Sequence, residues 1–143
     1  MDEMAKALEK KLHRSKKDVA YRRQQMNEAF PEAIVHFPLE LLKAVECIPD
    51  KDDRHVMAAA IMAKANAIVT QNTKHFPREC LEKFKILCQT ADDFLVHQYH
   101  LRPQAVLDKI DDQAAGIGET RKYVVSSLRP SASEFCKLLE NHI

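Results

Sequence analysis

Apolar positions early in the 143-residue chain recur at helical spacing. Residues 1–17 lack glycine and proline, and apolar positions such as Leu8 and Leu12 lie four residues apart, which predicts an amphipathic helix. Ser15 is suited to cap a second helix that runs toward Pro31. The first thirty residues are therefore predicted to be mainly helical.

Short apolar segments further along have the composition of strands. Residues 33–37 lie between two prolines, residues 67–70 form an apolar run followed by polar residues, and residues 85–90 repeat that pattern. Residues 56–64 are almost entirely apolar, which predicts a helix buried on most sides. This alternation of strand and helix is typical of a parallel sheet in an α/β fold.

The end of the chain returns to helical spacing. Pro103 suits the start of a helix, and a break at the two glycines of the chain precedes two further helices. These are expected over residues 119–128 and 131–139, the latter capped by Ser131 or Ser133. We therefore predict a helical extension after the α/β part.

The predicted domain boundary falls where the strands end. Residues 1–98 are assigned to a partial α/β domain and residues 99–143 to the C-terminal helical extension. The extension has an apolar stripe formed by Val106, Leu107 and Ile110. Such stripes commonly pack against a copy of the same chain, so an alternative structural interpretation treats residues 101–143 as an oligomerisation element, for example of a homodimer.

The charge balance limits the way in which the chain could bind nucleic acid. The 22 basic and 21 acidic side chains nearly cancel, so RNA recognition would have to be local. A basic cluster near the start could contact phosphates or an acidic partner, or could be a solvated helix face. Its members are Lys10, Lys11, His13, Arg14, Lys16, Lys17, Arg22 and Arg23.

The cysteines and the apolar runs predict a cytoplasmic protein. Cys47, Cys80, Cys88 and Cys136 show no C-x-x-C spacing and are expected to be reduced thiols, mostly among apolar neighbours. No apolar run approaches the roughly 18 residues that a membrane span needs, so no membrane association is expected.

Candidate chemistry lies at the predicted carboxyl end of the strand over residues 67–70. In open α/β sheets ligands bind at this end, and the helix preceding the strand should begin there, which brings Asp53 toward Asn72. Carboxylate, amide and hydroxyl oxygens favour Mg²⁺ or Mn²⁺ over zinc. The alternative is structural, because Asp often caps a helix and Asn often occupies a turn.

Two long motifs resemble the PIN-domain nuclease family. Residues 50–61, DKDDRHVMAAAI, are similar to the family pattern D-D-R-H-V-x-A-A-A-I, and residues 67–77, AIVTQNTKHFP, to I-V-T-x-N-x-x-D-F-P. Residues 91–95, ADDFL, resemble the family's P-D-E-F-L, so that the resemblance covers about residues 1–96. The helical extension is similar to that of a prokaryotic subgroup.

The resemblance implies a PIN-like three-layer α/β/α fold and an endoribonuclease that uses Mg²⁺ or Mn²⁺, often the toxin of a toxin-antitoxin system. RNA and an antitoxin protein are the implied partners. Glu3, in the upstream D-E-x-x-x-x-L pattern, and Asp53 are the implied metal ligands and catalytic acids, with Thr70 and Asn72 orienting water or phosphate. Asp52 is either a supporting residue or the helix cap.

The chain departs from the family pattern at two places. His75 stands where the family has its last aspartate, and a histidine does not replace a carboxylate for Mg²⁺. The family's first strands, which carry another aspartate, have no counterpart, so the chain is expected to be N-terminally truncated. We expect the sheet to pair differently or to receive strands from another chain, and the alternative function is a catalytically inactive binding module.

Overall fold

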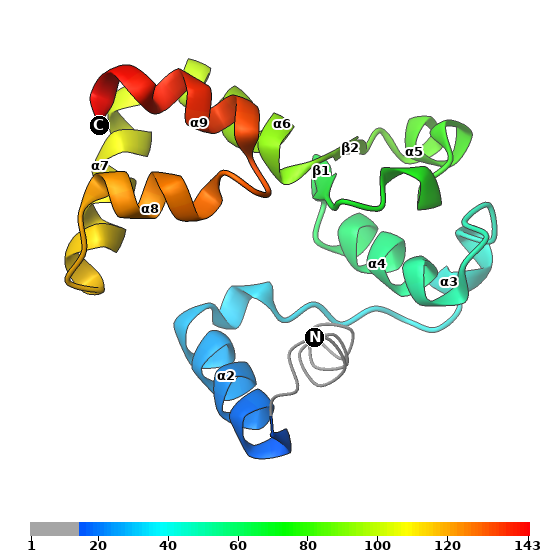
Figure 1. Ribbon diagram of the computed structural model, residues 1–143. Coiled ribbons are helices and arrows are strands. Elements are labelled where there is room, and N and C mark those ends of the chain that lie inside the picture. The colour runs from blue at the N-terminus through cyan, green and yellow to red at the C-terminus, as the bar shows by residue number, and fades with distance from the viewer. Residues whose placement is uncertain (1–14) are drawn as a thin grey trace. The chain divides into compact units, whose positions relative to one another are not determined.

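The computed structural model describes residues 15–143, and the chain divides into two units, residues 1–37 and 38–143. The first unit contains helix α2 (Lys16–Ala29) and the 3-10 turn η1 (Pro31–Ala33) (Figure 1). Ser15 is the N-cap that the sequence predicted, since its Oγ accepts a hydrogen bond from the backbone N of Asp18 at 3.2 Å. The helix expected over residues 1–17 lies mostly outside the described residues.

The strand predicted over residues 33–37 is wrong. Residues 34–37 are not in a strand, and the side chain of Ile34 is 44% exposed. A β-branched segment between prolines favours extended backbone, but a strand also needs a neighbour that accepts its backbone hydrogen bonds. Ile34 adopts the extended conformation that the local preference favours, but the described sheet consists of β1 and β2 and does not include this segment.

The second unit begins with an α/β part. Its two strands pair in parallel, with Ile68 opposite Cys88, which agrees with the predicted α/β class and with the predicted strands near residues 67–70 and 85–90. A parallel pair needs a crossover, and α5 provides it. The elements in order are α3 (Leu41–Ala44), α4 (Lys51–Met62), β1 (Ala67–Val69), η2 (Thr73–His75), α5 (Arg78–Phe84) and β2 (Leu87–Gln89).

The apolar face of α4 builds the core of this part. Met57 is fully buried, and Ile68 of β1 and Phe76 pack in the same cluster. The burial predicted for this apolar helix is thus confirmed on one face, but Met62, at its end, is 46% exposed and does not fill the core. The remaining buried members are Val45, Ile48, Ala60, Cys80 and Ile86.

Helices α6 to α9 form the predicted helical end of the chain (Figure 1). Thr90 caps α6 in a capping box with Asp93. Helix α6 runs through the expected boundary at residue 98, and its Tyr99 packs against the helical core. The bounds are α6 (Ala91–Leu101), α7 (Pro103–Gly116), α8 (Arg121–Leu128), α9 (Ser133–Leu139) and the 3-10 turn η3 (Glu140–His142).

Helix α9 is capped by a residue from a distant part of the chain. The N-cap position is Ala132, and neither Ser131 nor Ser133 makes the predicted cap. Instead, Asp92 of α6 accepts hydrogen bonds from the backbone N of Glu134 at 3.0 Å and of Phe135 at 2.8 Å. A carboxylate at a helix N-terminus satisfies unpaired N–H groups and opposes the helix dipole, so Asp92 ties α9 to α6.

An ion pair joins two further helices of the helical part. Arg121 of α8 donates through Nε and Nη2 to both carboxylate oxygens of Asp111 of α7, at 2.7 and 2.6 Å. Its Nη1 also donates to the backbone O of His142 at 2.7 Å. The hydrogen bond from Arg121 lowers the pKa of Asp111 below its ordinary value. One guanidinium thus joins α7, α8 and the end of the chain.

The prediction of four reduced cysteines is wrong for two of them. Cys47 and Cys80 form a disulfide across a sequence separation of 33 residues. Cys80 is buried in the core and Cys47 lies in the exposed loop before α4, so the bond was not visible from spacing. Cys88 and Cys136 are free thiols, and desolvation raises the pKa of each.

In the part of the chain that the structure describes, no helix has both the length and the apolar character that crossing a membrane would require.

We expect Asp92→Ala to lower the free energy of unfolding by about 1–2 kcal/mol, since it leaves two N–H groups of α9 without their acceptor. Urea denaturation followed by circular dichroism measures this. Asp112→Ala is the matched control, because Asp112 is an exposed carboxylate paired with Lys109 at 3.1 Å and should contribute less than about 0.5 kcal/mol. Equal stability of the two variants would show that the Asp92 cap does not hold α9.

We expect a thiol reagent to modify two cysteines in the unfolded, unreduced protein and four after reduction. The loop that the disulfide closes is 33 residues long, so Cys47→Ser should lower the free energy of unfolding by about 3–4 kcal/mol. Cys88→Ser, which leaves the disulfide intact, is the control. Four reactive thiols before reduction would contradict the bond.

Candidate metal centre

The first turn of α4 places acidic side chains at one end of the sheet. Asp50 is the N-cap, and its Oδ1 accepts a hydrogen bond from the backbone N of Asp52 at 2.9 Å. The prediction that Asp52 or Asp53 caps this helix is therefore corrected by two or three positions to Asp50, which leaves the side chain of Asp53 available for another partner. Arg54 fixes the preceding loop, since its Nε donates to the backbone O of Ile48 at 2.7 Å.

The loop after β1 is ordered by short-range hydrogen bonds. Thr70 Oγ1 accepts from the backbone N of Asn72 at 3.1 Å, and the backbone N of His75 donates to the backbone O of Asn72 at 3.0 Å. The backbone N of Thr70 also donates to the backbone O of Gln89 at 2.9 Å, which extends the parallel pairing by one residue. The turn η2 thus holds His75 at a defined place beyond the strand.

These two segments meet in a cluster of three potential metal ligands. His75 Nδ1 lies 2.9 Å from Asp53 Oδ2, and one ligand atom from each of Asp50, Asp53 and His75 lies within 4.8 Å of the other two. The side chain of Asp53 is 14% exposed, and that of His75 is 48% exposed. The cluster is therefore accessible to an ion or a phosphate on the side of His75.

The structure locates three of the four residues that the sequence analysis proposed. Asp53 is in the cluster, and Thr70 and Asn72 lie in the loop that leads to His75. Glu3 lies outside the described residues. Their proposed roles stay predictions, because the positions alone do not test them.

Sequence reasoning missed Asp50 and treated His75 as a departure from a pattern. Both had a signal. Asp50 precedes Asp53 by three residues, which is close to one helical turn and puts the two side chains on one side of the helix start. His75 occupies the position at which the resembling family has an acid, so the family pattern itself marks this position as one that faces the site.

The donor atoms suit a divalent cation of moderate softness. Adjacent ligands about 2.1 Å from an octahedral ion lie about 3 Å apart, and Asp53 Oδ2 and His75 Nδ1 lie 2.9 Å apart. Two carboxylate oxygens and one imidazole nitrogen make a mixed donor set rather than the all-oxygen set predicted from sequence. The residues thus fit a divalent ion, and the nitrogen donor of His75 affects which divalent ions the cluster would prefer.

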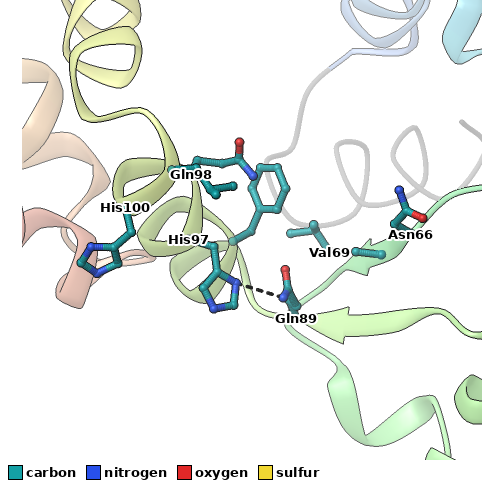
Figure 2. A pocket seen from close by; sticks show the side chains of 9 residues that line it. Asn66, Val69, Gln89, His97, Gln98 and His100 are labelled. Carbon is teal, nitrogen blue, oxygen red and sulfur yellow. Dashed lines mark hydrogen bonds between the residues drawn. The ribbon is translucent and has the colours of Figure 1, made fainter.

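A separate pocket of about 600 Å³ lies between the sheet and α6. Figure 2 shows Gln89 and His97 side by side in it, with Gln89 Nε2 and His97 Nδ1 3.1 Å apart. The pocket shares no residue with the metal-ligand cluster, and the sequence analysis did not identify it. Its lining residues are Asn66, Ala67, Val69, Gln89, Phe94, His97, Gln98, His100 and Leu101.

Comparison with known proteins finds a relative that matches part of this chain. A protein of Mycobacterium tuberculosis named "Putative ribonuclease VapC50" is 47% identical over 53 residues, which are 37% of this chain and 31% of that protein. The chain thus matches about a third of the length of this curated relative. No solved structure matches the chain.

The family comparison covers the α4 side of the candidate centre. The family model described as PIN domain matches residues 1–74, about half of the chain. The match includes Asp50, Asp53 and the polar loop after β1, and it ends one residue before His75. With α4, β1 and the acids at their shared end in the matched region, the chain belongs to the PIN domain family.

Proposed function

We propose that this chain acts as a PIN-type endoribonuclease, which hydrolyses RNA phosphodiester bonds with a divalent metal ion held at Asp53. The observation that carries the proposal is the contact of 2.9 Å between Asp53 and His75, with Asp50 within ligand distance. Membership of the PIN domain family and the relative named as a ribonuclease support the same activity.

The bound ion would supply two things, a metal-activated water as nucleophile and neutralisation of charge on the attacked phosphate. Asp53 and Asp50 would hold it through carboxylate oxygens, and Glu3 is retained as the further acidic ligand that the family resemblance implies. Of the two expected ions, Mg²⁺ and Mn²⁺, the mixed donor set favours Mn²⁺.

Thr70 and Asn72 are proposed to position the RNA phosphate. Thr70 Oγ1 accepts a hydrogen bond from the backbone N of Asn72, which leaves its hydroxyl hydrogen to donate to a phosphate oxygen. The side chain of Asn72 is exposed and offers an amide donor in the same loop. Two donors in the loop that leads to His75 would orient the phosphate toward the acids.

We propose that the sheet of the active protein extends beyond the two described strands to the three-layer α/β/α arrangement. Among the described residues, β1 pairs with β2 on one edge and has no strand on the other. In a parallel ladder alternate residues face alternate edges, so Ala67 and Val69 direct backbone groups toward the open edge. A further strand there would satisfy them and would bring the family's first acid toward Asp53.

An inactive binding module is the second candidate function. The observation that favours it is His75, which leaves two carboxylates in the described cluster where the family pattern provides a third. Such a module would retain the partner surface of a PIN domain without cleavage.

The remaining expectations concern partners and organisation, and they stay proposals. RNA is the substrate, and an antitoxin protein is the partner if the chain is the toxin of a toxin-antitoxin pair in the prokaryotic cytoplasm. The exposed basic side chains of α2, such as Lys16, Lys17 and Arg22, offer a surface for either. We also retain the division into residues 1–98 and 99–143 and the homodimer as proposals.

We expect Asp53→Asn to reduce metal-dependent cleavage of a labelled single-stranded RNA by about 100-fold, equivalent to ~2.7 kcal/mol of activation free energy. The substitution removes the negative charge of the carboxylate that contacts His75. Asp52→Asn is the matched control, because Asp52 is exposed, lies in the same helical turn and is not part of the cluster, and its rate should stay within about twofold.

Chelation of divalent ions should abolish cleavage by the unmodified protein. Cleavage that survives both chelation and Asp53→Asn would refute the proposed centre. A folded protein that binds RNA or a partner but cleaves nothing with any divalent ion would favour the binding module.

A further inference from the structure

The nitrogen donor in the cluster restricts which divalent ions suit it. Mg²⁺ strongly prefers oxygen ligands in octahedral geometry, whereas imidazole suits transition-metal ions. His75 supplies the one nitrogen in the described cluster, from the loop after β1, and two carboxylates come from the first turn of α4. The donor set therefore differs from the all-oxygen one for which Mg²⁺ is suited.

The three side chains are held close together before any ion binds. Asp50 is fixed as the N-cap of α4, with Oδ1 bonded to the backbone N of Asp52, which leaves its second oxygen to a ligand. Asp53 is 14% exposed and already in contact with His75. Ligands that are restrained in this way lose little conformational freedom on binding.

The Cys47–Cys80 disulfide closes a loop that contains the same three ligands. Cys47 lies three residues before Asp50, and Cys80 lies five residues after His75, so the loop closed by their disulfide contains all three ligands. The bond joins the loop before α4 to α5, and these segments flank the two that carry the ligands. Pairing Cys47 with Cys80 thus limits how far the acids and the histidine separate.

We propose that Asp50, Asp53 and His75 form a centre that selects a transition-metal ion able to accept imidazole, of the Mn²⁺, Co²⁺ or Zn²⁺ type, over Mg²⁺. This inference rests on the proposed metal-dependent function and specifies its ion. The affinity rises from Mn²⁺ through Co²⁺, in the order usual for sites with nitrogen and oxygen ligands, and Mg²⁺ binds most weakly. His75 is the residue that creates the difference.

The test compares binding of Mg²⁺, Mn²⁺ and Co²⁺ to the full chain by titration calorimetry. In the unmodified protein Co²⁺ and Mn²⁺ bind and Mg²⁺ competes poorly. In His75→Asp the ratio of Co²⁺ to Mg²⁺ affinity falls by at least about tenfold, since even the partners of a metal ligand contribute about 10- to 100-fold to affinity. His36→Asp, which changes an exposed histidine of the first unit, leaves the ratio unchanged.

A second measurement uses the unmodified protein, so it does not depend on whether a variant folds. Titration with Zn²⁺ shifts the imidazole resonances of His75 in nuclear magnetic resonance spectra and leaves those of His36 in place. Mg²⁺ at the same concentration shifts neither.

The outcomes separate this inference from the proposed function. Tight Mg²⁺ binding with unmoved His75 resonances, or an affinity ratio that is the same in His75→Asp, overturns the selectivity but leaves a metal-dependent nuclease standing. Absence of binding by all divalent ions overturns both. RNA cleavage that needs Mn²⁺ or Co²⁺ and does not proceed with Mg²⁺ supports both together.

Discussion

The parallel pairing of β1 with β2 is the constraint on which the arrangement of the site depends. Because the strands run the same way, α5 has to return the chain between them, and the loop after β1 and the start of α6 lie at the same end of the sheet. Helix α4 runs back against β1, so its acidic first turn reaches that end too. Convergence of Asp53 and His75, 22 residues apart, follows from the packing of α4 against β1 at this end of the sheet.

Two aspartates in the first turn of a helix show how tertiary contacts assign roles to the same side chain. Asp53 lies near the start of α4 and contacts His75 from the loop after β1. Asp92 lies near the start of α6 and accepts two backbone N–H groups of α9. Both positions suit a carboxylate because of the helix dipole, but the partner that each meets decides between chemistry and structural support.

The metal-ligand cluster combines a family feature with a local exception. The PIN domain match includes Asp50 and Asp53, whereas His75 lies just beyond it and replaces an expected acid. In the proposed centre a nitrogen ligand would favour transition-metal ions, since these accept carboxylate and imidazole together. The exception is therefore compatible with the metal-dependent role that we propose.

Local patterns determined much of this protein by themselves. The cap at Ser15, the capping box at Thr90, the two short strands and the helices after Pro103 follow from side-chain chemistry within a few residues, which acts in the same way in any context. The pattern also placed Asp53 near the carboxyl end of β1, where it contacts His75 from the loop after that strand. Contacts between distant residues were decided by tertiary structure alone: the Cys47–Cys80 disulfide, the Asp92 cap on α9 and the place of His75 beside Asp53. Spacing along a chain fixes which hydrogen bonds a residue can form with its neighbours, whereas packing of whole elements fixes which distant groups it meets.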